Sequence, residues 1–350
     1  MNSTKVGTPF VGPAQLPYQR LKNWVLGMLA VTISLVIAVG LLELYVRLVE
    51  TDGKNFDIEM WRYAKDLKTV SSINGVGHEH IPGQRGVYMG VPVKINSAGW
   101  RDQEHSMRKQ AGTIRVMMLG DSVTFGWGAG SEDVTSYRLE RLLNTGGKRT
   151  YEVINTGIGN ANTAMEAAYF MNKGYAYEVD VVVLNYFIND AEPTPRRTSN
   201  FLIEHFYSAV FIAGRLDIVM RRFFGKADWH QYYRDLYQEN QPGWPAARTA
   251  LRELYDFCKS RGIKLVIANY PEIHELSPYP FQRITSIVAS EAHGLGIPFL
   301  DLLPAVENQE PRSLWVTKTD THPNGKAAGL YAEAIRNFLV LQSPEDFSQP

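Results

Sequence analysis

Short apolar runs alternate with helical patterns from residue 114 almost to the end of the 350-residue chain. The expected strands span residues 114–119, 151–155, 179–187, 263–269 and 297–301. The expected helices lie near residues 131–145, 163–173, 246–261, 281–293 and 324–341. Such alternation is typical of a parallel sheet, because each helix carries the chain back to the edge where the next strand starts. We therefore predict a three-layer α/β/α domain with a central parallel sheet over residues 114–345.

The sequence Gly120-Asp121-Ser122 directly follows the first expected strand and precedes a glycine-rich loop and a helix. This order places Ser122 at the carboxyl edge of the sheet, where open α/β sheets bind their ligands. The amino end of a helix lies close to such a serine, and its free N–H groups favour developing negative charge. The pattern indicates a nucleophilic serine, which also requires a base and an oxyanion hole.

Three further blocks follow in an order that suits a serine hydrolase. They are residues 153–160, Asn189-Asp190 and Asp320-Thr321-His322. Together with Gly-Asp-Ser, these blocks resemble those of the SGNH (GDSL-type) hydrolase superfamily, over about residues 114–340. The resemblance implies the flavodoxin-like SGNH fold and a serine esterase activity.

The resemblance also implies a catalytic triad of Ser122 as nucleophile, His322 as base and Asp320 as the acid that orients the histidine. An ordinary hydroxyl hardly ionises near neutral pH, so Ser122 needs the imidazole within hydrogen-bond reach. The commoner pattern of the superfamily is Asp-x-x-His, but residue 319 is threonine here. The Asp-x-His spacing resembles that of alginate O-acetyltransferase-type members instead.

Three donors are expected in the oxyanion hole. The backbone N–H of Ser122 is one, and the side-chain amide of Asn189 is the second by resemblance to the superfamily. The third is a backbone N–H in residues 153–160, where the superfamily's glycine aligns with Gly159 or Asn160 depending on the register. We favour Gly159 as the marker of this donor.

The pocket around these donors is expected to be narrow, because Phe187 stands where the superfamily commonly has a glycine. Four residues at the ends of expected strands or turns are candidates to contact the substrate: Trp127, Asn160, Tyr186 and Tyr270.

Other polar residues near these blocks are expected to be structural. Asp121 and Asp190 stand beside tight turns, where a carboxylate more often bonds the backbone than a substrate. Arg101 and Asp102 fit a surface ion pair better than a catalytic role. His274 is expected to be an ordinary loop histidine.

Composition excludes several other classes of function. The formal net charge is +0, so nothing favours binding to nucleic acid. The single cysteine, Cys258, excludes a disulfide within the chain and fits a core position. The histidines show no metal-site spacing, and no nucleotide-binding fingerprint occurs, so we expect neither a metal nor another cofactor.

Residues 24–46 are expected to anchor the chain in a membrane, after a tail at residues 1–23. Residues 24–42 carry no charge and would reach roughly 28 Å as a helix, close to the thickness of a bilayer core. Arg20 and Lys22 mark the cytoplasmic side, which leaves the catalytic part outside, in the periplasm of a Gram-negative cell. The alternatives are a cleaved signal peptide and a buried core helix.

Two segments are harder to interpret. Residues 47–113 are expected to contain a small β-element, because residues 86–96 alternate with period two and Pro92 indicates an edge or a break. Residues 192–245 form an aromatic-rich helical insertion. The insertion is interpreted as a helical subdomain with aromatic core residues, as a lid or sugar-stacking surface over the site, or as a membrane-surface contact.

Together these features predict a membrane-anchored, outward-facing esterase that removes an acyl group from a carbohydrate or cell-envelope ester. The alternatives are an O-acetyltransferase with the same triad, which passes the acyl group to a sugar hydroxyl, and an inactive module that binds an envelope polymer. The glycan preference rests on the anchor, the aromatic insertion and analogy with the superfamily.

Overall fold

The computed structural model describes residues 17–146, 149–194, 200–224 and 228–347. Five parallel strands form the central sheet in the order β6-β5-β7-β8-β9. Their bounds are Thr150–Asn155 (β6), Thr113–Leu119 (β5), Val181–Tyr186 (β7), Lys264–Asn269 (β8) and Phe299–Asp301 (β9). The predicted parallel sheet is confirmed.

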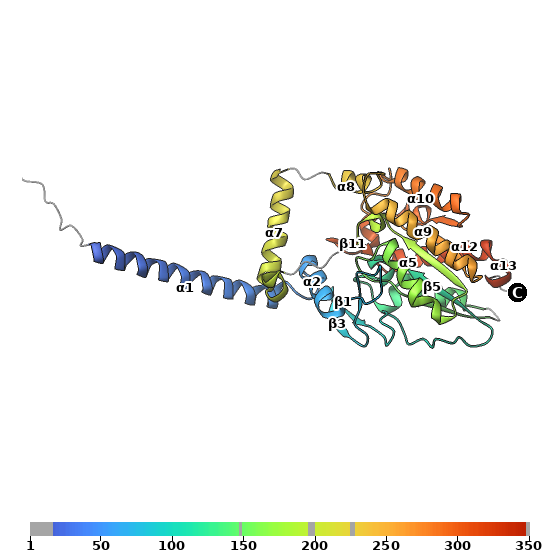
Figure 1. Ribbon diagram of the computed structural model, residues 1–350, viewed down its shortest axis with the longest axis horizontal. Coiled ribbons are helices and arrows are strands. Elements are labelled where there is room, and N and C mark those ends of the chain that lie inside the picture. The colour runs from blue at the N-terminus through green and yellow to red at the C-terminus, as the bar shows by residue number, and fades with distance from the viewer. Residues whose placement is uncertain (1–16, 147–148, 195–199, 225–227, 348–350) are drawn as a thin grey trace, which may run out of the picture.

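Helices cover both faces of this sheet, which completes the predicted three layers (Figure 1). Alternate residues of β5 supply the two cores, because successive side chains of a strand point to opposite faces. Met117 and Leu119 pack under α5 (Thr163–Asn172), α9 (Gly243–Ser260) and α10 (Gln282–Leu295). Val116 and Met118 pack under α4 (Thr135–Leu143) and α12 (Gly325–Gln342).

The shorter elements complete the domain. They are α3 (Ser122–Phe125), α11 (Leu303–Val306), α13 (Pro344–Phe347), the 3₁₀ turns Ser131–Asp133, Gly174–Tyr177, Ile188–Ala191 and Pro311–Leu314, and the strands β10 (Trp315–Thr317) and β11 (Asp320–Pro323). β10 and β11 pair antiparallel as a hairpin, separate from the central sheet.

A close backbone approach at Gly157 fixes the turn that follows β5. A Cβ on Gly157 would lie 2.2 Å from the backbone nitrogen of Phe125, so only glycine fits between β6 and α3. Asp121 caps α3 by accepting a hydrogen bond from the N–H of Val123. The strand-to-helix turn is therefore held from both sides.

The N-terminal part lies outside the sheet domain. α1 (Pro17–Val49) contains the stretch Tyr18–Val49, which is long and apolar enough to cross a membrane. An 18-residue window of this stretch has a mean hydropathy of 2.7 and is not buried in the protein, whereas Val46 near its end is buried. α2 (Phe56–Leu67) follows, and then two antiparallel pairs: β1 (Lys68–Val70) with β2 (His78–His80), and β3 (Arg85–Tyr88) with β4 (Val91–Lys94). The alternating residues 86–96 thus form two short strands joined by a turn.

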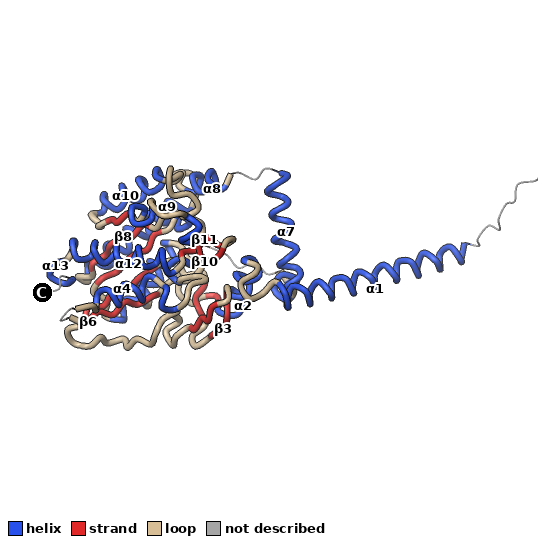
Figure 2. Tube along the Cα trace, turned by 180° about the vertical axis from the view of Figure 1, so that it is seen from behind, coloured by secondary structure: helices blue, strands red, loops and turns tan. Residues whose placement is uncertain are grey.

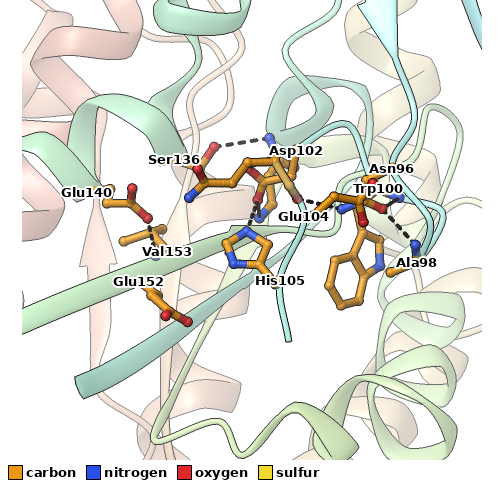
Figure 3. Close-up of polar contacts among 12 residues, drawn as sticks. Asn96, Ala98, Trp100, Asp102, Glu104, His105, Ser136, Glu140, Glu152 and Val153 are labelled. Carbon is orange, nitrogen blue, oxygen red and sulfur yellow. Dashed lines mark hydrogen bonds and ion pairs between the residues drawn. The ribbon is translucent and has the colours of Figure 1, made fainter. Parts of the chain in front are cut away.

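The expected surface ion pair of Arg101 and Asp102 is wrong. Arg101 is buried and donates to the backbone carbonyls of Phe125, Gly126 and Ala129, so it fixes the loop after α3. Asp102 instead accepts a hydrogen bond from the N–H of Asn155 at the end of β6. The Asp102 carboxylate also lies near His105, whose Nε2 is 3.1 Å from one of its oxygens (Figure 3).

The aromatic insertion divides into two parts. α6 (Phe201–His205) and α7 (Tyr207–Phe224) lie beside α1 and α2, whereas α8 (Trp229–Leu236) lies near α10 (Figures 1 and 2). Tyr237 and Trp244 are core residues of the sheet domain. The insertion is therefore neither wholly a subdomain core nor wholly a lid.

Glu166 on α5 is a buried carboxyl group whose ionisation should make the stability of the domain depend on pH. Its side chain is buried and neither carboxylate oxygen has a hydrogen-bond partner among the described residues. Burial raises the pKa of Glu166 well above its usual value, and the carboxylates of Asp190 and Asp121 raise it further. Its stabilising contribution is therefore complete below about pH 4.5 and falls as the pH rises toward the folded-state pKa.

We predict that Glu166→Gln, which cannot ionise, raises Tm relative to the wild type at pH 8 but not at pH 4. Each kcal/mol relieved corresponds to about 2–4 °C in a domain of this size. Thermal unfolding across this pH range measures the difference. The exposed Glu333→Gln is the control and should show no such trend. A Tm difference for Glu166→Gln that does not change with pH would contradict this account.

Candidate active site

Ser122, His322 and Asp320 lie in one hydrogen-bonded row at the carboxyl edge of the sheet. His322 Nε2 lies 2.8 Å from Ser122 Oγ, and His322 Nδ1 lies 2.6 Å from Asp320 Oδ1. Ser122 and Asp320 are buried, and the imidazole keeps 18% of its side chain exposed. The three side chains thus have the geometry of a nucleophile, a base and an orienting acid.

The conformation of β11 explains how Asp320 and His322 act together at two-residue spacing. Residues 320–323 are extended, and side chains two apart on a strand point to the same side. The N–H of His322 also donates to Asp320 Oδ1 at 3.0 Å. An extended segment therefore allows an Asp-x-His pair to act from one side of the strand.

Trp127 was expected to contact the substrate, but this expectation is wrong. Its indole is buried and its Nε1–H donates to Asp320 Oδ2 at 3.0 Å. Both oxygens of the Asp320 carboxylate are therefore engaged, one by His322 and the other by Trp127. Trp127 orients the acid of the row from behind.

Asp121 connects the nucleophile to Asn189. Asp121 Oδ2 accepts a hydrogen bond from Asn189 Nδ2 at 3.0 Å and lies 3.4 Å from Ser122 Oγ. Burial raises the pKa of Asp121, while its hydrogen bonds from Val123 and Asn189 oppose this rise. Asp190 accepts from Thr163 Oγ1 and from the N–H of Phe187. Both carboxylates bond their surroundings in the manner expected of structural residues.

The expected marker of the third oxyanion donor, Gly159, is contradicted by its contacts. The N–H of Gly159 donates to the hydroxyl of Tyr63 at 3.0 Å and is not available to a substrate. The adjacent Asn160 is exposed at the cleft and has a left-handed backbone, with φ +62°. Among the described residues, no acceptor occupies the backbone N–H of Asn160 or of Ser122. The alternative alignment, in which Asn160 takes the place of the superfamily's glycine, therefore fits better.

A cleft of about 630 Å³ opens in front of Ser122. Its lining comes from seven segments of the chain: Phe56, Met60, Ser122, Val123, Asn160, Phe187, Asn189, Trp229, Tyr232, Tyr233, Pro271, Glu272, Ile273, His274, Thr321, His322 and Pro323. Tyr186 and Tyr270, two expected substrate contacts, are buried core residues outside this lining. Tyr186 bonds the hydroxyl of Tyr237, and Tyr270 packs against Tyr331.

Several cleft residues were not among the individually predicted site residues. Phe56 stacks on the His322 ring, with centroids 6.2 Å apart and planes at 25°. Trp229 and Tyr233 come from α8, which among the described residues of the insertion is the one part that reaches the cleft. His274, expected to be an ordinary loop residue, also lines the cleft and pairs with Glu272. The hydrogen bond that Glu272 accepts from the imidazole raises the pKa of His274, against the effect of burial.

This arrangement suits acyl transfer through a serine nucleophile. A base lies in contact with the hydroxyl, an acid orients the base, and N–H donors border the same cleft.

A match to one family model agrees with this chemistry. The GDSL-like lipase/acylhydrolase family model matches residues 118–330. The structure is similar to a catalytic mutant of an acetylxylan esterase from Geobacillus stearothermophilus, with 16% identity, a TM-score of 0.44, and coverage of 66% of this chain and 96% of that chain. It is also similar to the lipase/acylhydrolase from Enterococcus faecalis, with 14% identity, a TM-score of 0.41, and coverage of 68% and 98%. A comparison with curated proteins gave no match.

The contact between Trp127 and Asp320 generates a prediction. Trp127→Phe keeps an aromatic ring at this position but removes the hydrogen bond to the Asp320 carboxylate. We therefore expect kcat for ester hydrolysis to fall about 10-fold or more with little change in KM. Steady-state kinetics measures both constants. The matched control is Trp100→Phe, which removes a buried indole bond to Tyr169 far from the row. Equal effects of the two substitutions on kcat would refute the role of Trp127.

Proposed function

The chain belongs to the GDSL-like lipase/acylhydrolase family and is an ester-bond hydrolase, and on that premise we propose a specific substrate and location for it. It is proposed to be a membrane-anchored esterase that removes acetyl groups from a carbohydrate of the cell envelope. Its proposed catalytic residues are Ser122, His322 and Asp320. The single observation that carries this assignment is the 2.8 Å contact between His322 Nε2 and Ser122 Oγ.

In the proposed reaction, Ser122 Oγ attacks the acyl carbon while His322 Nε2 takes the hydroxyl proton. The resulting imidazolium is stabilised by Asp320. The bond to the sugar oxygen then breaks as His322 returns the proton to that oxygen, which leaves an acyl-serine. Water attacks the acyl-serine with His322 again as the base, and acetate departs as Ser122 regains its proton.

The oxyanion of both tetrahedral intermediates is proposed to accept hydrogen bonds from the backbone N–H groups of Ser122 and Asn160 and from Asn189. The second N–H of the Asn189 amide is the donor, because the first is bonded to Asp121. Preorganised donors of this kind commonly contribute about 10²–10³ each to turnover. Asn160 replaces Gly159 in this assignment.

The dimensions of the cleft support a small acyl group and a sugar. Phe187 and Val123 border the space beside Ser122 and leave less room for a long acyl chain. Farther out, Trp229, Tyr232 and Tyr233 present aromatic rings together with polar groups. Aromatic faces provide large, flat contact surfaces with a polar edge, which suits the face of a sugar ring.

α1 supports the proposed location. Its apolar length suits a single membrane crossing, and Arg20 and Lys22 precede the apolar stretch. By the positive-inside rule the N-terminus lies in the cytoplasm and the catalytic domain outside. The ester substrate is therefore proposed to belong to the outer side of the membrane.

A second candidate function is O-acetyl transfer to a sugar hydroxyl with the same residues. Two observations favour it: the Asp-x-His spacing and the stacking of Phe56 on His322, which covers one face of the base. Shielding of a reactive intermediate from water favours transfer over hydrolysis. The two activities differ only in the acceptor of the second step.

Hydrolysis of p-nitrophenyl acetate by the purified full chain in detergent tests the proposal. We predict that Ser122→Ala lowers kcat/KM by about 10³-fold or more, because the covalent step is lost. Ser286→Ala, an exposed serine on α10, is the control and should retain full activity. Retention of wild-type activity by Ser122→Ala would refute the assignment. Faster transfer to an added oligosaccharide than to water would favour the acetyltransferase.

A further inference from the structure

The peptide unit between Gly159 and Asn160 is held from behind by two side chains of the N-terminal part. The carbonyl of Gly159 accepts hydrogen bonds from Lys68 Nζ and from His78 Nε2, the latter at 3.0 Å. In a trans peptide the C=O and the following N–H point in opposite directions. A carbonyl fixed on the side of Lys68 therefore directs the N–H of Asn160 the other way, and Asn160 borders the cleft.

The preceding peptide unit is fixed as well. The N–H of Gly159 donates to the Tyr63 hydroxyl, which lies 2.7 Å from Nε2 of the buried His80. A Cβ on Gly159 would lie 2.9 Å from the Tyr63 ring, so a larger residue would displace this contact. Both polar groups of Gly159 are thus bound by residues of α2, β1 and β2.

Lys68 is an unusual residue to find in this place. It is partly buried, and no carboxylate lies within ion-pairing distance of it in the described part of the chain. Its neighbours are His78, with Nε2 3.3 Å from Nζ, and the Tyr63 ring, whose centroid is 4.6 Å away. Burial lowers the pKa of Lys68 to about 7. A cation without a counter-charge costs stability, so a structural role alone explains it poorly.

We propose that Lys68 and His78 are positioning residues that hold the Gly159 carbonyl so that the N–H of Asn160 faces the acyl oxygen. A donor on the carbonyl also polarises the peptide and strengthens its N–H as a hydrogen-bond donor. Both residues precede residues 118–330, the part matched by the family model. This inference rests on the proposed function, because Lys68 and His78 are assigned to position the N–H of Asn160, one of the proposed oxyanion donors.

The test compares Lys68→Met with Lys173→Met in the full chain. Lys173 also bonds a backbone carbonyl, but that of Ala98 rather than that of Gly159. Lys68→Met is expected to lower kcat for p-nitrophenyl acetate about 10- to 100-fold with KM little changed, as for loss of oxyanion stabilisation. It should also weaken inhibition by methyl trifluoromethyl ketone (1,1,1-trifluoroacetone) in proportion, because that inhibitor forms a tetrahedral oxyanion with the serine. Lys68→Arg should retain part of the wild-type kcat and part of the wild-type affinity for the inhibitor.

The outcomes distinguish a failure of the positioning role of Lys68 from a failure of the proposed esterase function. If Lys68→Met and Lys173→Met keep wild-type kcat while Ser122→Ala is inactive, the positioning role is refuted and the esterase stands. If the wild type is inactive, the proposed function itself fails. Should Lys68→Met unfold, the same kinetics on His78→Gln decide, and unchanged kcat and inhibitor affinity there would overturn the proposal.

A second inference concerns α7 and is independent of the cleft. Glu43 near the end of α1 accepts hydrogen bonds from the first N–H groups of α7, Tyr207 at 3.2 Å and Ser208 at 2.8 Å. Arg47 pairs with Glu43 at 2.7 Å and lies over the Tyr207 ring. The start of α7 is thereby joined to α1 where its apolar stretch gives way to charged residues.

The two faces of α7 differ in what covers them. Val210 is buried against Val46 of α1 and Ile58 of α2. The opposite stripe holds four apolar residues that are 42–57% exposed: Ile212, Leu216, Val219 and Met220. Their spacing of four, seven and eight residues places them on one side of the helix. An apolar stripe without protein cover requires another partner.

The arrangement of the helices indicates which partner. α7 runs across the end of α1, and α1 and the catalytic domain extend to opposite sides of it (Figures 1 and 2). The packed face of α7 contacts the end of α1 and α2, and the exposed stripe lies on the opposite side of the helix. A helix in this position lies in the plane of the bilayer that α1 would cross, with its apolar stripe toward the lipid.

We infer that α7 lies on the outer surface of the membrane and inserts this stripe among the lipids. Spin labels on single cysteines of the full chain, in phosphatidylcholine nanodiscs and with Cys258→Ala as background, test this. Oxygen, which dissolves in lipid, should increase the spin-relaxation rate of labels at Leu216→Cys and at Leu35→Cys in α1. A label at the exposed Glu253→Cys on α9 should be relaxed by water-soluble nickel chelate.

A label at residue 216 that behaves like the one at 253, while the label at 35 reports lipid, would overturn the role of α7 and leave the anchor intact. A label at residue 35 that reports water would refute the anchor.

Discussion

The hydrogen bond between His322 and Ser122 joins residues that are 200 positions apart, and the site depends on it. The parallel sheet makes it possible, because β5 delivers the serine to the same edge at which β11 delivers the histidine. The hairpin β10–β11 then adds what the sheet does not supply, an extended segment that presents Asp320 and His322 on one side. Trp127 binds the remaining carboxylate oxygen of Asp320, so the orientation of the base is set by buried contacts on both sides of the acid.

The N-terminal part of the chain contributes to the site as well as to the anchor. α2 brings Phe56 over the His322 ring and Tyr63 to the N–H of Gly159, while β1 and β2 bring Lys68 and His78 to the carbonyl of Gly159. These residues precede the part of the chain that the family model matches. The cleft is thus closed on one side by a segment that directly follows the candidate membrane helix. Through α7 and Glu43, the same region ties the insertion to α1.

Period and order in the sequence were sufficient to predict the parallel sheet and the helical layers. Resemblance to the SGNH superfamily supplied Ser122, Asp320 and His322, which the structure brings together in one row. The substrate contacts were harder, because a position at the end of a strand does not determine whether the side chain faces the cleft or the core. Trp127, Tyr186 and Tyr270 are examples, because all three side chains are buried in the core instead of lining the cleft. Gly159 and Asn160 differ by one residue, and only the contact of Gly159 with Tyr63 separates the two registers. Lys68 and Phe56 carry no motif, since their roles arise from packing between distant segments.

Covalent trapping of the nucleophile tests the central claim most directly. The full chain is incubated with a fluorophosphonate ester, which reacts with a serine activated by a neighbouring base, and the adduct is mapped by peptide mass spectrometry. The account predicts one adduct, on Ser122, that forms far more slowly in His322→Ala. Absence of an adduct on Ser122, or equal labelling in His322→Ala, would contradict a serine activated by this histidine.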